Sequence, residues 1–449
     1  MLHSIIAHRQ GTSLLYWIYG VLGTIFFPLL ILLLALAALI RPGLGHGLGQ
    51  RLGNIKPVRP DNGDQTVTLW IHAASVGEVQ AAHALIVELT TRAANIFFVV
   101  TTMTEQGRRV AKEQLPAGVS CFLAPLDVPF LVRRALGRIR PDMYICLETE
   151  LWPAMLSEAR RAGVKMVLLN GRMSERTYRR YRLLRGFMAQ LLAGFSRFAV
   201  IRPADGRRFA GLGADASRIM VAGNIKYDLA RNEPEAARAR YRSLLGLTDE
   251  TVFLCGSTGP GEEHILAGVY RELQERSGEK IVWIVAPRHL ERLPEVKQLL
   301  TGLGLGYDLY TELAARGRQH DVVLVDCMGE LAGLYSAGDY NFCGGSLVND
   351  GGHNIMEAAR WGKPVYYGPY MSDFLDALDL LEPAGAGFRA RDGRHLAAVI
   401  LGHMKDRRGY EAAGAAAARV TASQQGAAGR QADLVLQLLA SRDDGAAIK

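Results

Sequence analysis

From about residue 66 onward, short apolar runs alternate with longer helical stretches. The runs are almost continuously apolar, which is typical of parallel strands that are covered on both faces. Helical stretches between such strands predict an α/β fold with doubly wound sheets. The expected strands are 66–73, 96–101, 143–147, 165–169, 197–201, 251–255, 281–286, 321–325, 339–343 and 364–367.

The chain divides near its middle. Its 449 residues are too many for one ordinary core, so two domains are expected. The polar stretch "DLARNEP" at 228–234 is typical of a linker between them. In doubly wound sheets ligands bind beyond the carboxyl ends of the strands, so the loops after each strand are the first candidates for a site. The expected segments are 1–48, 49–230, 231–425 and a C-terminal helix and tail at 426–449.

The segment before the first domain predicts a membrane anchor. Residues 14–40 form a run of 27 residues without a charge, and about 20 apolar residues suffice to cross a bilayer. The run is too long for the apolar region of a cleaved signal peptide. Basic residues are more frequent after it than before it, which weakly favours a cytoplasmic location for the body. A helix that lies only half inserted is the alternative.

Charge and cysteine content limit which partners and which redox compartment are expected for the protein. Residues 1–230 hold 28 Lys and Arg against 15 Asp and Glu, a balance of +13, whereas the remainder holds 24 against 29. A basic first half favours a phosphorylated partner or an anionic membrane surface, with an ordinary solvated basic face as the alternative. The five cysteines form no CxxC pair, which favours buried thiols in a reducing compartment over disulfides or a zinc site.

The stretch "HAASVGEVQAA" places Glu78 where an expected strand passes into a helix. A carboxylate there is either a charge that stabilises the helix terminus or a catalytic base at the edge of the sheet. Further along, "CLETELWP" places Glu148 and Glu150 two residues apart, on one face if the segment is extended. "NGRMSERTYRRYRLLR" holds six arginines, which suit either a phosphate-binding surface or a solvated helix. Lys226 in "GNIKYD" lies close to the expected linker.

Two glycine-containing loops of the second half are candidates for phosphate binding. "CGSTGPGEE" leads from a strand into a helix, and the backbone amides at Gly256, Gly259 and Gly261 are then free to approach a phosphate. "DGGHNIMEAA" offers two glycines before Asn354 and Glu357, whose spacing also fits a capping box. We expect a nucleotide site here, with the glutamate accepting hydrogen bonds from ribose hydroxyls.

Two further strand ends carry polar groups. Arg288 in "APRH" is suited to pair with a phosphate, and "DCMGEL" presents Glu330. No DxD follows an expected strand, and no HExxH, Cys/His cluster or GxSxG is present. The sequence therefore offers no support for a metal-held sugar diphosphate, a zinc site or a serine hydrolase.

Taken together, these loops resemble the Kdo (3-deoxy-D-manno-oct-2-ulosonic acid) transferases of lipopolysaccharide biosynthesis. The motifs that carry the resemblance are "HAASVGEVQAA", "TTMTEQG", "LETELWP", "NGRMSER", "GNIKYD", "GSTGPGEE", "APRH", "MGEL" and "GGSLVNDGGHNIMEAA…GKPV…GP". Each motif alone is weak, but nine in this order are highly specific. The resemblance extends from the membrane segment to about residue 425.

The resemblance implies a GT-B fold, with an acceptor-binding domain at 49–230 and a CMP-Kdo-binding domain at 231–425. It implies inverting transfer of Kdo from CMP-Kdo to a lipid A precursor at the cytoplasmic face of the inner membrane, without a cofactor or an active-site metal and without nucleic acid. Glu78 matches the family's base, and Lys226 with one carboxylate of "LETELWP", favoured to be Glu150, matches residues that assist the transition state. The residues that match CMP contacts are Pro287, Arg288, Met328, Gly329, Glu330, Asn354, Ile355, Met356 and Glu357.

Two positions depart from the family pattern. Gly259 with Pro260 replaces a histidine and its neighbour, and Asp373 stands where an asparagine is usual. Both positions lie in or near the expected nucleotide loops, so they bear on donor contacts and not on Glu78. Two alternatives stay open: a membrane-associated GT-B transferase that uses another nucleotide sugar, and a GT-B scaffold that has lost its activity.

Overall fold

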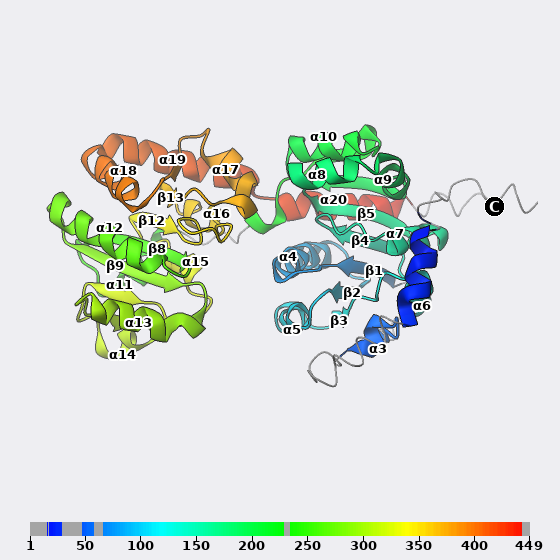
Figure 1. Cartoon of the computed structure of the whole chain (residues 1–449), viewed down its shortest axis with the longest axis horizontal. Coiled ribbons are helices and arrows are strands. Elements are labelled where there is room, and N and C mark those ends of the chain that lie inside the picture. Colours follow the sequence, from blue (N-terminus) through cyan, green and yellow to red (C-terminus); the bar gives the residue numbers. More distant parts are fainter. Residues whose placement is uncertain (1–15, 17, 29–46, 58–65, 229–233, 442–449) are drawn as a thin grey trace, which may run out of the picture. The chain divides into compact units, whose positions relative to one another are not determined.

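The computed structural model describes residues 16, 18–28, 47–57, 66–228 and 234–441 (Figure 1). It divides into two compact units: unit 1 is Met1–Asp228 with Gly426–Lys449, and unit 2 is Leu229–Gln425. The chain therefore returns to unit 1 after completing unit 2. Residues 229–233 of the expected linker lie outside the described residues.

Unit 1 is built on a parallel sheet of seven strands in the order β3-β2-β1-β4-β5-β6-β7. The order reverses between β1 and β4, which pair directly, with His72 opposite Cys146. Such a reversal is where doubly wound sheets bind ligands. The strands are β1 (Val67–His72), β2 (Ile96–Thr102), β3 (Ser120–Leu123), β4 (Met143–Leu147), β5 (Lys165–Gly171), β6 (Phe195–Val200) and β7 (Ile219–Val221).

Helices cover both faces of this sheet. One apolar cluster joins the sheet to α6, α7, α9 and α10, and the cluster on the opposite face joins it to α4, α5 and α20. The C-terminal helix α20, red in Figure 1, thus belongs to the core of unit 1. The helices are α3 (Leu48–Arg51), α4 (Val76–Arg92), α5 (Glu105–Gln114), α6 (Pro129–Ile139), α7 (Pro153–Arg161), α8 (Glu175–Arg182), α9 (Arg185–Leu192), α10 (Pro203–Gly211), η3 (Ala216–Arg218), η4 (Ile225–Tyr227) and α20 (Ala427–Ala440).

Unit 2 holds a second parallel sheet of seven strands, in the order β10-β11-β9-β8-β12-β13-β14. Its order reverses between β8 and β12, where Cys343 lies opposite Gly256. The strands are β8 (Thr251–Thr258), β9 (Ile281–Pro287), β10 (Asp308–Leu309), β11 (Val322–Leu324), β12 (Tyr340–Cys343), β13 (Val365–Tyr367) and β14 (Gly387–Arg389).

Helices again follow the strands of unit 2. They are α11 (Pro234–Leu244), α12 (Glu262–Ser277), η5 (Leu290–Arg292), α13 (Leu293–Gly302), η6 (Tyr310–Glu312), α14 (Leu313–Arg316), α15 (Leu331–Leu334), α16 (Met356–Ala359), η7 (Ser372–Phe374), α17 (Leu375–Leu381), α18 (Gly393–Lys405) and α19 (Arg407–Gln424). The predicted α/β class with two doubly wound sheets is confirmed.

The predicted membrane anchor falls mostly outside the described residues. Of the run 14–40, the structure describes residue 16 and a helical stretch at 18–28. Within the part of the chain that the structure describes, no helix has both the length and the apolar character needed to cross a bilayer.

Candidate functional site

Glu78 lies at the start of α4, directly after the loop that follows β1. Its carboxylate accepts hydrogen bonds from the backbone N–H of Ala74 at 2.9 Å and from the Ser75 hydroxyl at 2.8 Å. Ser75 is the N-cap residue and its hydroxyl in turn faces the N–H of Glu78, so the pair forms a reciprocal capping arrangement. Glu78 therefore does stabilise the helix terminus, as one of the two sequence interpretations expected.

A capping role alone does not explain the surroundings of Glu78. Its side chain is buried, with only 5% of the residue exposed, and no cation is paired with its carboxylate in the described structure. Burial, followed by the nearby negative charge of Glu148, raises the pKa of Glu78 to about 7. A carboxylate with a pKa near neutrality is suited to take up a proton during a reaction, which an exposed capping glutamate is not.

Glu148 is the centre of an ion-pair network at the adjacent strand end. It directly follows β4 and has a positive φ of 56°, an uncommon conformation for a residue other than glycine. One carboxylate oxygen accepts a hydrogen bond from the Lys226 ammonium, and the other accepts one from Nε of Arg172 at 2.8 Å. Because β1 and β4 are neighbours where the strand order reverses, Glu78 and this network meet at one edge of the sheet.

Gly77 gives Lys226 room to approach the start of α4. A Cβ atom built on Gly77 would lie 3.2 Å from the Lys226 Nζ atom, closer than side chains normally pack. Any larger residue there would press on the lysine. The glycine that precedes Glu78 is thus explained by the close approach of a charged group, the lysine that pairs with Glu148.

Glu150 points to a different partner. Its carboxylate accepts the indole N–H of Trp152 at 2.9 Å, and burial raises its pKa. The expectation that Glu148 and Glu150 share one face assumed an extended segment. That assumption is wrong, because the positive φ of Glu148 turns its side chain toward Lys226 and Arg172. The structure brings Glu78, Glu148 and Lys226 together, whereas the role predicted for Glu150 stays a prediction.

In unit 2, a buried glutamate occupies the position in which the sequence suggested a phosphate. Glu262 is fully buried and its carboxylate accepts four backbone N–H groups, those of Gly259 at 2.8 Å, Gly345 at 2.6 Å, Ser346 at 2.9 Å and Leu347 at 2.7 Å. The expectation that the amide of Gly259 approaches a phosphate is therefore wrong. The protein's own carboxylate takes that amide, and it ties the loop after β8 to the loop after β12.

The loop after β12 continues to the predicted nucleotide contacts. Asn354 accepts the N–H of Met356 at 3.2 Å and donates to the Glu357 carboxylate at 3.1 Å. The helix α16 that follows has four residues. Burial raises the pKa of Glu357. His353 directly precedes Asn354; its buried Nε2 has no hydrogen-bond partner among the described residues, and burial lowers its pKa to about 4.

The other predicted CMP contacts lie at neighbouring strand ends of unit 2. Pro287 ends β9, and the Arg288 side chain after it is exposed. Met328 is 63% exposed, and Glu330 accepts hydrogen bonds from the hydroxyls of Tyr241 at 2.9 Å and Tyr310 at 3.1 Å. These two tyrosines fix the orientation of the glutamate.

Both departures from the family pattern also lie in these loops. The amide of Gly259 is held by Glu262, and the Asp373 N–H donates to the carbonyl of Gly351 at 3.1 Å. Both residues belong to unit 2, whereas Glu78 belongs to unit 1. Among the described residues, no group of three or more His, Cys, Asp or Glu side chains is placed to hold a metal ion, and all five cysteines are free thiols.

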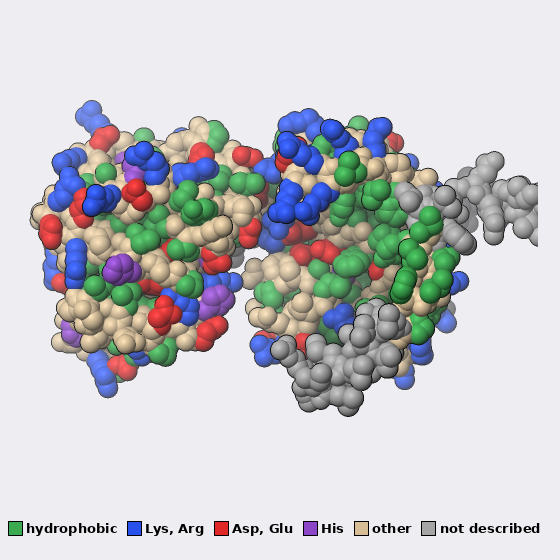
Figure 2. Space-filling model, viewed as in Figure 1, with side chains coloured by type: hydrophobic (Ala, Val, Ile, Leu, Met, Phe, Trp, Pro, Cys, Tyr) green, Lys and Arg blue, Asp and Glu red, His purple; other side chains and the backbone are tan. Residues whose placement is uncertain are grey.

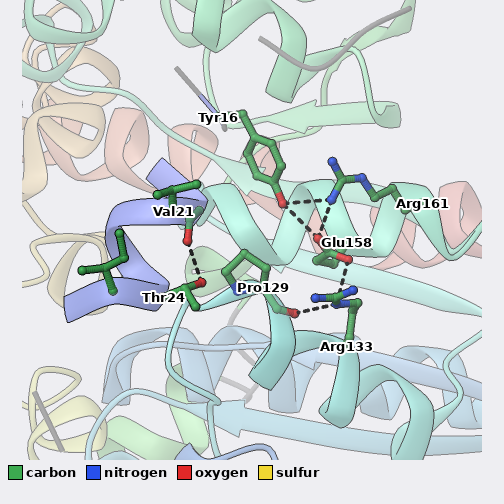
Figure 3. A pocket seen from close by; sticks show the side chains of 9 residues that line it. Tyr16, Val21, Thr24, Pro129, Arg133, Glu158 and Arg161 are labelled. Atoms are coloured by element: carbon green, nitrogen blue, oxygen red, sulfur yellow. Dashed lines mark hydrogen bonds and ion pairs between the residues drawn. The ribbon is translucent and has the colours of Figure 1, made fainter. Parts of the chain in front are cut away.

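Unit 1 also carries two cavities away from Glu78. One of about 360 Å³ opens between residues of the stretch 16–25 and the side chains of Arg133, Glu158 and Arg161 (Figure 3). Tyr16 is buried and donates its hydroxyl to Glu158, which also pairs with both arginines. A second cavity of about 600 Å³ shares the three charged residues. Exposed apolar side chains stand beside the first cavity: Ile18, Leu22, Ile25, Phe26 and Phe130.

The geometry can be compared with known proteins. A family model described as 3-deoxy-D-manno-octulosonic-acid transferase (kdotransferase) matches residues 46–229. The chain is 33% identical to the 3-deoxy-D-manno-octulosonic acid transferase of Chlamydophila psittaci, over 82% of this chain and 84% of that protein. The chain belongs to the Kdo transferase family. As a Kdo transferase it is a glycosyltransferase.

Two further similarities extend this comparison. The chain is 31% identical to a bifunctional glycosyltransferase/methyltransferase of Fusobacterium nucleatum over 72% of its own residues, and it spans half the length of that protein. A crystal structure of a glycosyltransferase from Rickettsia africae superposes with a TM-score of 0.55 at 12% identity, covering 84% of this chain and 99% of that one. The second similarity concerns the fold alone, which is GT-B-like, with two parallel-sheet α/β domains.

Proposed function

We propose that this Kdo transferase moves Kdo from CMP-Kdo to a hydroxyl of a lipid A precursor, with inversion and with Glu78 as the general base. The single observation that carries the role of Glu78 is its burial without a paired cation, at the edge of the sheet where the strand order reverses. Membership of the Kdo transferase family supports Kdo transfer, and the resemblance of the motifs to the family's CMP contacts supports CMP-Kdo as donor and a lipid A precursor as acceptor.

Different residues take up the proton and stabilise the negative charge that develops during the reaction. The Glu78 carboxylate takes the proton of the acceptor hydroxyl while that oxygen attacks the anomeric carbon of Kdo. The bond between this carbon and the phosphate oxygen breaks, and CMP departs with the electron pair. Lys226 supplies a positive charge near the reacting atoms, and Glu148 holds the lysine in place. No cofactor is invoked.

Residues of unit 2 are proposed to hold the donor. Arg288 suits the phosphate, and the carboxylates of Glu330 and Glu357 suit the hydroxyls of the ribose or the amino group of the base. Glu262 acts behind them, because its four backbone hydrogen bonds fix the two loops at the reversal of the sheet. A fully buried anion that is satisfied by backbone amides keeps such loops in one conformation.

The acceptor and the location are proposed from the surface of unit 1. Lys and Arg side chains gather on the face of unit 1 that carries α8 and α10 (Figure 2). The exposed apolar side chains at 18–26 stand beside Arg133 and Arg161, whose side chains are 65% and 50% exposed. This combination suits the anionic cytoplasmic surface of the inner membrane, where each basic residue contributes about 1 kcal/mol. The single anchor proposed at 1–48 would hold the enzyme there.

A transfer assay tests the proposal. Membranes that contain the full chain are incubated with CMP-Kdo and a tetra-acylated lipid A precursor, and the product is weighed by mass spectrometry. Addition of one or more Kdo masses supports the proposal, and the mass counts the sugars. Competition by CMP but not by UDP supports the donor; competition by UDP instead would favour a transferase of another nucleotide sugar, and CMP binding without transfer would favour an inactive scaffold.

A further inference from the structure

The C-terminal helix α20 carries a fully buried glutamine into the core of unit 1. Gln431 has no exposed surface, although the helix face around it is otherwise apolar. Its Oε1 accepts the backbone N–H of Asn170 at 2.8 Å, and its Nε2 donates to the carbonyl of Gly223 at 3.2 Å. A primary amide accepts and donates at once, so this one side chain bridges two backbone segments that are distant in sequence.

The first of these segments supports Glu148. Asn170 lies near the end of β5 with a positive φ of 53°, a conformation that asparagine tolerates better than most residues. The residue before it, Leu169, accepts the backbone N–H of Glu148 at 2.9 Å. Gln431 therefore holds the backbone of Asn170, which directly follows Leu169, the residue whose carbonyl accepts the N–H of Glu148.

The second segment carries Lys226. Gly223 has a φ of 82° and begins the turn, and the side chain of Asn170 accepts the N–H of Ile225 at 2.9 Å. Asn224 accepts the N–H of Lys226 at 3.0 Å through its own side chain. Both ends of the short segment 223–226 are thus held by side-chain amides, and one of them is Gln431.

We propose that Gln431 is a positioning residue for Kdo transfer: it fixes the backbones of 169–170 and 223–226, and through them the pairing of Lys226 with Glu148. The inference rests on the proposed roles of those two residues. Loss of the amide would leave the buried N–H of Asn170 and the half-buried carbonyl of Gly223 without this partner, so both segments would shift to find new ones. The lysine would then lose its fixed position while the donor-binding loops of unit 2 stay unchanged.

The chain offers a matched control in the same helix. Val435 is also fully buried in α20, and it belongs to the apolar cluster on this face of the sheet. Val435→Ala removes packing from α20 without removing a hydrogen bond to either segment. Gln431→Met keeps the approximate length and volume of the side chain and removes only its polar groups. A purely structural role for Gln431 predicts that the two variants behave alike at equal stability.

The experiment measures kcat and KM for CMP-Kdo in the full-length wild type, Gln431→Met, Val435→Ala, Lys226→Ala and the double variant Gln431→Met/Lys226→Ala. We expect Gln431→Met to lower kcat about 10- to 100-fold with KM for the donor changed less than about twofold, whereas Val435→Ala keeps kcat within about threefold. In the Lys226→Ala background, Gln431→Met should cost less than about threefold, because the group that it positions is gone.

The outcomes distinguish failure of the role proposed for Lys226 from failure of the role proposed for Gln431. If Lys226→Ala transfers Kdo as fast as wild type, the role proposed for the lysine is wrong. If Lys226→Ala is impaired but Gln431→Met is not, or if the two losses multiply, the positioning role is wrong. Hydrogen–deuterium exchange provides a readout without turnover: peptides that cover 165–171 and 219–228 should exchange faster in Gln431→Met than in Val435→Ala. Equal exchange in the two variants would overturn the inference.

Discussion

The ammonium of Lys226 pairs with the carboxylate of Glu148, and the same lysine lies against Gly77, the residue before Glu78. Glu78 is a buried carboxylate, and no cation is paired with it among the described residues. This arrangement separates the work of the two glutamates. Glu148 holds a cation, and Glu78 stays available to exchange a proton.

Transfer should depend on pH through Glu78. Its pKa is raised to about 7, and only the deprotonated carboxylate accepts the acceptor's proton. The rate at low substrate concentration should therefore rise with pH up to about 7 and fall about tenfold per pH unit well below that value. Initial rates between pH 5 and 9 test this. A rate that is constant down to pH 5 would show that no group with this pKa limits the reaction.

Replacement of Glu78 by Gln should stabilise the fold at high pH. The folded-state pKa of about 7 lies above the unfolded value of about 4.5. As the pH rises from 4.5 to 7, the wild-type carboxyl loses its proton more easily in the unfolded state, so the free energy of unfolding falls. Above pH 7 the gain in the free energy of unfolding of the variant is on the order of 3 kcal/mol, and it should vanish near pH 4. Thermal unfolding at pH 8 and pH 4.5 measures the difference. An equal melting temperature at pH 8 would contradict the buried, uncompensated charge.

Glu148 and Glu150 should differ when each is replaced by Gln. Glu148→Gln frees Lys226 and removes the charge that raises the pKa of Glu78, so the acidic limb of the pH profile should move to lower pH and kcat should fall about 100-fold. Glu150→Gln keeps a hydrogen-bond acceptor for Trp152 and should cost less than about tenfold. Steady-state kinetics of the two matched variants decides between them. If Glu150→Gln loses more activity than Glu148→Gln, Glu150 is the residue that assists the transition state.

Glu262 should control nucleotide binding from behind the loops. Glu262→Gln replaces one acceptor oxygen by a donor that faces backbone N–H groups, so the loops after β8 and β12 should separate. We expect the affinity for CMP to fall more than about tenfold, whereas replacement of the exposed His264 by Ala should leave it unchanged. Isothermal titration calorimetry measures both. A folded Glu262→Gln protein with wild-type affinity for CMP would contradict the role of this anion.

The apolar side chains of the stretch 18–28 should matter only at a membrane. Replacement of Leu22, Ile25 and Phe26 by Ser removes exposed apolar surface. Transfer to an acceptor in anionic vesicles should fall, whereas transfer to the same acceptor in detergent micelles should not. Val87→Ser, at an exposed apolar position on α4, is the control. An equal loss in vesicles and micelles would show that these side chains serve another purpose.

The sequence predicted the long strands because they are buried on both faces and therefore read as continuous apolar runs. All ten expected strands are present. It did not predict β3, β7, β10 and β14, which are short and lie in the outer part of each sheet, so their sequences carry few consecutive apolar residues.

The sequence predicted which residues belong to the site but not which of them pair with one another. The sequence places Glu78 and two further glutamates after strands and Lys226 close to the expected linker, but the choice between Glu148 and Glu150 depends on a backbone turn that spacing does not reveal. The glycine-rich loop after β8 resembled a phosphate cradle, and only the fold shows that Glu262 occupies it. A signal for Gln431 was present, since it is a polar residue on the apolar face of α20, but its partners at Asn170 and Gly223 required the tertiary structure.

The most direct test of the central claim compares wild type with Glu78→Gln. Both are incubated as full-length protein in membranes with CMP-Kdo and a tetra-acylated lipid A precursor, and mass spectrometry follows the Kdo product while calorimetry measures CMP binding. We predict that Glu78→Gln binds CMP as wild type does and transfers Kdo at least about 100-fold more slowly. Equal transfer by both proteins would contradict the account, because Glu78 would then serve only to cap α4.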